Sequence, residues 1–169
     1  MRIKFRMLAV VLLGASVGAA VAYGMGPAAS ASAIPNEIQG QSLQAVVYKS
    51  PTCGCCEVWV KHLRDAGFGV TVRDTHNMSP VKQKLGVPAR MASCHTAQIG
   101  GYFIEGHVPM ADIQRLLKER PKALGLAVPG MPAGSPGMEQ PSGKVDRYDV
   151  LLVTADGGTK VFSSHGPRK

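Results

Sequence analysis

Residues 44–66 read QAVVYKSPTCGCCEVWVKHLRDA, and they combine an apolar run, a cysteine-rich turn and an amphipathic segment. The first five residues are mostly apolar and β-forming, which predicts a strand. From Glu57 to Ala66, apolar residues recur with polar ones between them, which predicts a helix, and an acidic residue in the first turn favours one. Cys53 and Cys56 therefore lie at a strand-to-helix junction, where the positive end of the helix dipole favours thiolate over thiol.

The elements that follow complete an α/β pattern. Gly67 is typical of a helix end, Ser79-Pro80 of a helix start and Gly100-Gly101 of a tight turn. The predicted order is strand, helix, strand, helix, strand, strand, helix, followed by a late hairpin. This order predicts a thioredoxin-like mixed sheet flanked by helices, with an extra C-terminal β-hairpin. Beyond the first strand and helix, the predicted ranges are 69–74, 79–85, 92–99, 102–108, 110–120, 148–154 and 159–163.

Residues 121–142 are predicted to be loop-like, because Pro-Gly and Gly-x-Pro steps interrupt them repeatedly. A flexible linker is one interpretation of this stretch. The other is a packed lid over the site, since a loop of this length inside a small domain is often functional.

The N-terminal residues 1–33 have the pattern of a secretory signal peptide. Arg2, Lys4 and Arg6 precede an apolar run, and Ala31-Ser32-Ala33 supplies small residues for cleavage. An uncleaved membrane anchor is the alternative, because the apolar run approaches the length of a membrane span. With cleavage, residues 34–169 form a single thioredoxin-like metal-binding domain that is exported and has no further membrane contact.

The charge pattern argues against nucleic acid as a partner. The chain has 19 basic and 11 acidic side chains, a formal net charge of +8, but its basic residues are spread along the sequence. It has one tryptophan and few other aromatic residues, so neither a basic cluster nor a stacking platform is present in the sequence.

The four cysteines make a metal site or a redox site the central question. Cys53, Cys55 and Cys56 lie within one turn, and Cys94 follows much later. Thiolates are soft ligands that select Cu(I), Zn and iron–sulfur centres. Cys55 is one thiol more than a dithiol exchange needs, and a disulfide between the neighbours Cys55 and Cys56 is strained. Three crowded sulfurs plus Cys94 therefore suit a Cu(I)–thiolate cluster with several ions.

Other arrangements of the same cysteines stay open at this point. Two structural bridges, Cys53–Cys56 and Cys55–Cys94, would be ordinary in an exported domain. A tetrahedral zinc site is a further alternative, although its ligands usually come as two separated pairs. A thiol–disulfide oxidoreductase would use Cys53 to attack and Cys56 to resolve.

Four further residues are candidate metal ligands. His107 ends a predicted strand just before a helix, a junction that approaches the active loop in glutaredoxin-like topology. His95 follows Cys94 directly, but along a strand its side chain would point to the opposite face, unless the strand begins only after them. Met131 and Met138 lie in the Pro/Gly loop without a helical face that could bury them. His62 and His165 are interpreted as solvated.

Four motifs together resemble the CopG-type periplasmic copper-resistance proteins of Gram-negative bacteria, over about residues 45–164. They are SPTCGCC at 50–56, SCHTA at 93–97, EGHVP at 105–109 and GLAVPGMP at 125–132. The resemblance implies a thioredoxin-like fold, a periplasmic location and a centre in which cysteines bridge several copper ions. By position, Cys53, Cys55, Cys56 and Cys94 would carry that centre.

The resulting functional hypothesis is a periplasmic protein that binds copper, or silver, in metal resistance. The resemblance implies interconversion of Cu(I) and Cu(II) for efflux, and hence a copper efflux or redox partner protein, while the sequence leaves copper oxidoreductase activity open. The alternatives are the thiol–disulfide oxidoreductase and a disulfide-stapled module that binds a protein partner.

Overall fold

The computed structural model describes residues 43–168. The predicted signal peptide and the first residues of the predicted domain lie outside this range. Within residues 43–168, no helix has the length and apolar character needed to span a membrane.

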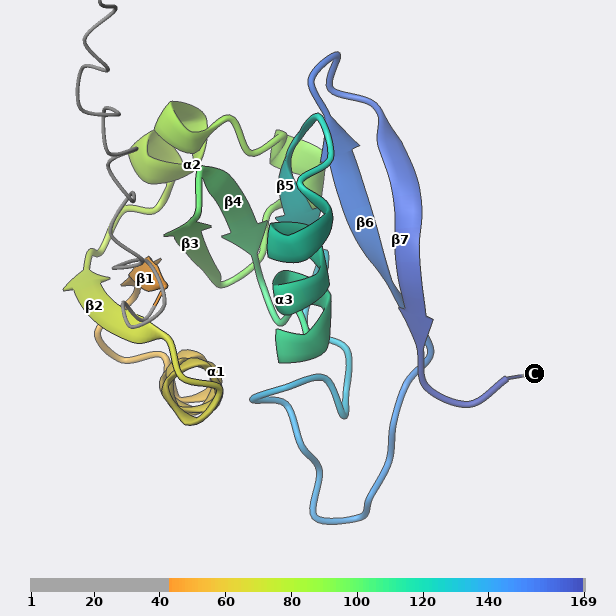
Figure 1. Cartoon of the computed structure of the whole chain (residues 1–169). Helices are drawn as coiled ribbons and strands as arrows, with labels where there is room; N and C mark the ends of the chain where they lie inside the picture. The colour runs from red at the N-terminus through yellow and green to blue at the C-terminus, as the bar shows by residue number, and fades with distance from the viewer. Residues whose placement is uncertain (1–42, 169) are drawn as a thin grey trace, which may run out of the picture. The chain divides into compact units, whose positions relative to one another are not determined.

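Three α-helices and seven strands make up the described chain, with a short 3-10 helix between α2 and β3 (Figure 1). The predicted first strand and helix are present, and the helix begins three residues earlier than expected, inside the CGCC motif. The elements are β1 (Gln44–Lys49), α1 (Gly54–Asp65), β2 (Gly69–Asp74), α2 (Ser79–Leu85), η2 (Ala89–Met91), β3 (His95–Ile99), β4 (Tyr102–Glu105), α3 (Met110–Glu119), β5 (Ala123–Ala127), β6 (Tyr148–Thr154) and β7 (Thr159–His165).

The strands form one mixed sheet in the order β2-β1-β3-β4-β5-β6-β7. β1 pairs with β2 in parallel and with β3 in antiparallel fashion, so the end of β1 lies beside the start of β3. In that register Lys49 faces His95, which brings the loop after β1 next to the segment that carries Cys94. The topology therefore places the CGCC motif and the fourth cysteine at one edge of the sheet.

Two apolar clusters cover the two faces of the sheet. α1 and α3 pack Trp59, Leu63 and Ile113 against strand residues such as Ile104, all fully buried. Phe103 points to the other face, because side chains alternate along a strand, and there it packs with residues around α2 and η2. The CGCC motif lies on the α1 side, so the larger cluster supports it.

The predicted fold class is confirmed: a mixed α/β sheet flanked by helices, with a C-terminal hairpin formed by β6 and β7. The thioredoxin-like label within that class stays a prediction. The hairpin is attached to α3 by a hydrogen bond from His165 Nε2 to Asp112 Oδ2 at 2.7 Å. The Arg115 guanidinium also lies 3.7 Å from the ring centre of Phe162. The interpretation of His165 as solvated is therefore wrong.

The largest differences from the predicted elements after the first helix concern β5, β3 and β4. β5 (Ala123–Ala127) lies inside the stretch predicted to be a loop. It pairs in parallel with β4, and Gly125 is needed there because a Cβ at this position would lie 2.0 Å from the Phe103 carbonyl oxygen. β3 begins at His95 rather than at residue 92, because residues 89–91 form the 3-10 helix. β4 ends at Glu105 instead of Val108.

Candidate metal centre

The first part of the centre is the loop between β1 and α1. Cys53 is the N-cap of α1, and Cys55 and Cys56 lie in its first turn. Cys53 and Cys56 form a disulfide in the structure, whereas Cys55 and Cys94 are free. The Cys55 sulfur lies 3.4 Å from that of Cys53. One of the two bridges considered from the sequence, Cys53–Cys56, is therefore present, and Cys55–Cys94 is not.

The fourth cysteine joins this loop from across the sheet. Cys94 immediately precedes β3, and its sulfur and those of Cys53, Cys55 and Cys56 all lie within 4.8 Å of one another. Cys56 is buried and the other three are partly exposed. Four sulfurs at such separations are close enough to share metal ions once the disulfide is reduced.

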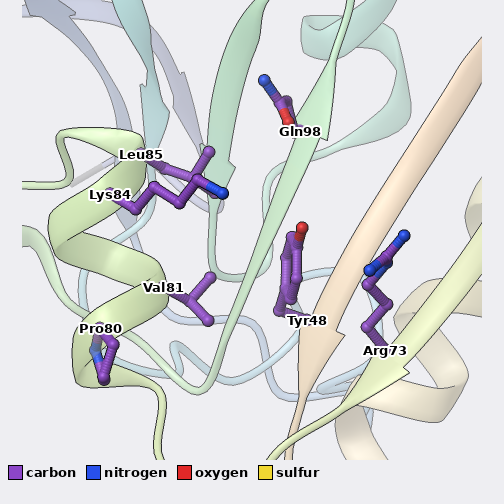
Figure 2. A pocket seen from close by; sticks show the side chains of 7 residues that line it. All are labelled: Tyr48, Arg73, Pro80, Val81, Lys84, Leu85 and Gln98. Carbon is purple, nitrogen blue, oxygen red and sulfur yellow. The ribbon is translucent and has the colours of Figure 1, made fainter.

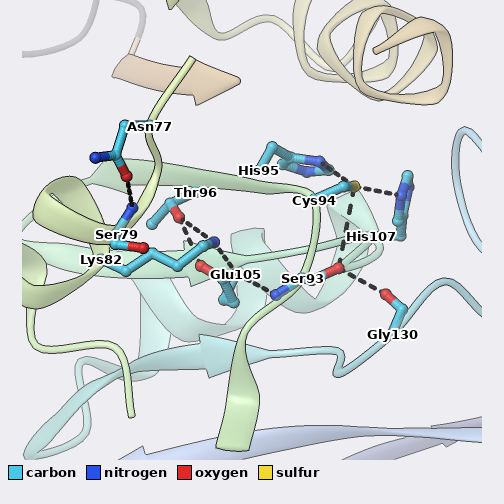
Figure 3. A network of polar contacts seen from close by, with 10 residues as sticks. All are labelled: Asn77, Ser79, Lys82, Ser93, Cys94, His95, Thr96, Glu105, His107 and Gly130. Atoms are coloured by element: carbon cyan, nitrogen blue, oxygen red, sulfur yellow. Dashed lines mark hydrogen bonds and ion pairs between the residues drawn. The ribbon is translucent and has the colours of Figure 1, made fainter. Parts of the chain in front are cut away.

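Two histidines adjoin Cys94 (Figure 3). The Cys94 sulfur lies 3.2 Å from His95 Nδ1 and 3.1 Å from His107 Nε2. Cys94, His95 and His107 form a second group whose donor atoms lie within 4.8 Å of one another. Cys94 and His95 do not alternate along a strand, because β3 starts at His95 and Cys94 lies before it, so both side chains can lie on the same side. Cys94 is thus shared by a sulfur group and a sulfur–imidazole group.

A backbone carbonyl from the long loop fixes the tautomer of His107. His107 Nδ1 lies 2.8 Å from the Pro136 carbonyl oxygen, which can only accept, so Nδ1 carries the hydrogen. Nε2 then has a free lone pair toward Cys94, as a metal-binding imidazole requires. The next residue, Gly137, packs closely against the CGCC loop, because a Cβ at this position would lie 2.6 Å from the Cys55 carbonyl oxygen. Loop residues 130–138, called the lid below, are therefore a packed segment rather than a flexible linker.

Burial controls the protonation of the centre. It raises the pKa of the Cys94 thiol to about 11, and the neighbouring Cys55 adds to the rise. Burial lowers the pKa of His107, and it lowers that of His95 far more, with His107 and Lys82 contributing as nearby positive charges. At neutral pH the imidazoles are neutral and Cys94 is a thiol, so binding of a metal at Cys94 must release its proton.

Acid is expected to destabilise the fold through the same histidines. Below about pH 6.5, the unfolded chain takes up protons that buried His95 and His107 do not accept, so the free energy of unfolding falls as the pH falls. Each histidine contributes at most about 1.4 kcal/mol per pH unit. Urea unfolding between pH 7 and pH 5 measures this slope.

His107→Gln is expected to show a shallower slope than the wild type over this range, since one buried imidazole is gone. His76→Gln, at an exposed position, is the control and should keep the wild-type slope. An unchanged slope in His107→Gln would contradict the assignment.

The two methionine candidates lie in the same loop. Met131 is 54% exposed and follows Gly130, whose carbonyl oxygen accepts a hydrogen bond from the Ser93 hydroxyl at 2.6 Å. Met131 is thus attached to a segment that borders Cys94, and Met138 is half-buried. Their role as ligands stays a prediction. His62 is partly exposed and pairs with Glu139 at 2.8 Å.

Sequence reasoning missed a buried ammonium behind the CGCC loop. Lys49 is fully buried at the end of β1, 2.6 Å from Glu57 Oε1 and 3.0 Å from Asp74 Oδ1. Its ammonium also donates to the Ser50 carbonyl at 3.2 Å. It thereby ties the first turn of α1 and the end of β2 to the start of the loop. The only sequence signal is position: Lys49 continues the inward-facing series Ala45, Val47 along the strand.

The centre does not coincide with a cavity that lies beside α2. A cavity of about 300 Å³ lies between α2 and strands β1, β2 and β3 (Figure 2). Its lining contains no cysteine or histidine, and it consists of Tyr48, Arg73, Pro80, Val81, Lys84, Leu85 and Gln98. The metal-binding groups instead lie at the sheet edge beneath the lid.

A mixed α/β domain with four converging sulfurs and two adjoining imidazoles defines a class of cysteine-rich metal-binding proteins. Two solved structures, described as "Copper resistance protein copG- Form 2" and "Copper resistance protein copG- Form 1", share 48% and 47% sequence identity with the chain. Each alignment covers 75% of this chain and 100% of the chain in the solved structure, with a TM-score of 0.71. The chain belongs to the CopG family of copper resistance proteins.

Two further comparisons complete this assignment. The family model described as "Protein of unknown function, DUF411" matches residues 91–138, which include Cys94, His95, His107 and the lid. Comparison with the curated proteins gives no match. Family membership and the cysteine cluster together support copper binding by this chain.

Proposed function

We propose that the protein acts in copper resistance in the periplasm, where it holds several Cu(I) ions in a cysteine-bridged cluster. The observation that carries this proposal is the convergence of four sulfurs within 4.8 Å from two distant parts of the chain. Thiolates are the preferred ligands of Cu(I), and neighbouring thiolates can bridge separate ions. Reduction of the Cys53–Cys56 disulfide by two electrons supplies the full set of sulfur ligands.

The second donor group extends the proposal to both oxidation states of copper. Imidazole accommodates Cu(II) better than thiolate does, and His95 and His107 share Cys94 with the sulfur group. A copper ion next to Cys94 therefore has donors for either state within reach. Interconversion would pass one electron per ion to or from a redox partner, and an efflux protein would receive the product. Silver, another soft monovalent ion, would be held by the same sulfurs.

A thiol–disulfide oxidoreductase is the second candidate, and the disulfide between Cys53 and Cys56 favours it. The bond lies at the N-terminus of α1, where the helix dipole stabilises a leaving thiolate. Once a dithiol reductant has reduced this bond, the Cys53 thiolate would attack a substrate disulfide and release one substrate thiolate, and Cys56 would resolve the mixed disulfide, so that the Cys53–Cys56 bond forms again. Cys55 and Cys94 have no role in that reaction, which separates the two candidates.

Anaerobic titration of the reduced protein with Cu(I) tests the choice between them. The wild type should bind more than one Cu(I) per chain, and Cys55→Ser should bind fewer, because Cys55 is a bridging ligand only in the cluster. Thr52→Ala, at an exposed position in the same loop, is the control and should keep the wild-type stoichiometry.

The opposite pattern would reject the cluster. If Cys55→Ser keeps the wild-type copper stoichiometry and full disulfide-exchange activity while Cys53→Ser loses that activity, the oxidoreductase is the better description. A third outcome is that all four cysteines are in disulfides and that the protein takes up no copper even after reduction. That outcome would reject both candidates in favour of a disulfide-stapled module that binds a protein partner.

A further inference from the structure

A buried carboxylate lies on the strand that leads to His107. Glu105 ends β4 and is fully buried. Its carboxylate accepts hydrogen bonds from the Ser93 backbone N–H at 2.5 Å and the Thr96 hydroxyl at 2.6 Å, and it pairs with the Lys82 ammonium (Figure 3). A buried charge of this kind is costly unless it is paired and hydrogen-bonded, so its surroundings must supply all three partners.

The partners of Glu105 come from separate elements. Lys82 belongs to α2, a helix with no buried residue, and its ammonium also donates to the Thr96 hydroxyl at 2.9 Å. Thr96 belongs to β3, and Ser93 to the segment just before that strand. The carboxylate therefore connects α2, β3 and β4 to the segment 93–95.

The same segment is held at two more points, both next to Cys94. The Ser93 hydroxyl donates to the Gly130 carbonyl of the lid at 2.6 Å, and the Gly106 N–H donates to the His95 carbonyl at 3.0 Å. Gly106 leaves no room for displacement: a Cβ there would lie 2.6 Å from the Ser93 hydroxyl and 2.5 Å from the Val128 carbonyl oxygen. Among these contacts, the Glu105–Ser93 bond is the one made by a charged side chain.

We propose that Glu105 is a positioning residue of the metal centre. Its bond with the Ser93 backbone N–H fixes the backbone position of the next residue, Cys94. The fourth sulfur and the two imidazoles are thereby held against the three sulfurs of the CGCC loop. Lys82 holds the carboxylate in place through their ion pair. This inference rests on the proposed copper function, because the effect on copper is exerted through Cys94.

A double-mutant cycle tests whether Glu105 acts through Cys94. Glu105→Gln keeps the shape but removes the charge, so the ion pair with Lys82 is lost and the bond from the Ser93 N–H becomes weaker, because hydrogen bonds to charged groups are the stronger ones. In the otherwise wild-type protein and in Cys53→Ser, the substitution should weaken Cu(I) binding about 10–100-fold, the usual effect of disturbing a group behind a ligand. In Cys94→Ser the same substitution should have little further effect, since the residue it positions is absent.

A matched control separates positioning from loss of stability. Asp112 is another buried acid, on α3, and its carboxylate binds His165 and Arg115 rather than segment 93–95. Asp112→Asn should lower the melting temperature without changing the affinity for Cu(I). A copper-free readout is the alkylation rate of Cys94 in a variant whose other three cysteines are serines, and Glu105→Gln should raise that rate.

The outcomes are distinguishable from failure of the proposed function. Equal affinity losses in all three backgrounds, or no loss together with an unchanged alkylation rate, would overturn the inference. If the wild type binds no Cu(I), the proposed function falls, and the alkylation rate alone decides the role of Glu105. If Glu105→Gln does not fold, Lys82→Gln replaces it, with a smaller loss expected in the same backgrounds.

Discussion

Replacing Cys94 by serine is expected to lower the affinity for Cu(I) by at least about 100-fold. Mutation of a group that hydrogen-bonds to a metal ligand lowers the metal affinity about 10–100-fold, and removal of the ligand itself should lower it by no less. Cys94 belongs to both donor groups, so its loss removes the fourth sulfur and also separates His95 and His107 from the remaining three. A serine hydroxyl is a hard donor and does not replace thiolate toward Cu(I).

Competition with a Cu(I) chelator under anaerobic conditions measures this loss. Ala92→Ser is the control, because it introduces a serine at an exposed position of the same segment without removing a sulfur. Its affinity should equal that of the wild type. Wild-type affinity in Cys94→Ser would show that the three sulfurs of the CGCC loop are sufficient, and the four-sulfur cluster would then be wrong.

Trp59→Ala is expected to lower the free energy of unfolding by about 3–5 kcal/mol, the range for deletion of a large buried aromatic side chain. Trp59 is fully buried in α1, and its Nε1–H donates to the Val108 carbonyl at 3.0 Å. Its ring also packs against His95, with ring centres 4.3 Å apart. The substitution would leave a cavity, an unpaired carbonyl and an unsupported imidazole.

Urea unfolding of the reduced, copper-free protein measures the change. Val58→Ala, at the neighbouring position of the same helix, is the control: Val58 is 42% exposed and its substitution should change the free energy by no more than about 0.5 kcal/mol. A similar small change for Trp59→Ala would show that the core around α1 is not what supports the centre.

The sequence predicted the parts of the site that depend on local pattern and topology. The run 44–48, the helix after it and the spacing of Cys53 and Cys56 are local signals, and they were confirmed. Convergence of Cys94 on that loop was expected from the cysteine pattern and the family resemblance, and in the structure the pairing of β1 with β3 produces it. β5 escaped prediction because a short buried parallel strand with a central Gly125 has neither alternation nor β-branched residues.

The remaining parts depend on contacts that no local pattern encodes. Lys49 and Glu105 are charged residues in buried strand positions, and their partners lie on other elements. The lid acts through the backbone carbonyl of Pro136, and a carbonyl is present in every residue, so its role is invisible in the sequence. For this reason the linker and the lid could not be distinguished before the structure.

The start of β3 between Cys94 and His95 has a thermodynamic consequence for the proposed cluster. Because the two residues are consecutive and their donor atoms lie 3.2 Å apart, they can grip one ion as a chelate whose ring closes through a single peptide unit. Little backbone freedom remains to be lost when such a ring closes. In the proposed cluster, the Cys94-His95 dipeptide at the start of β3 would therefore bind one ion through two donors at little entropic cost, and the more distant sulfurs would add further ligands.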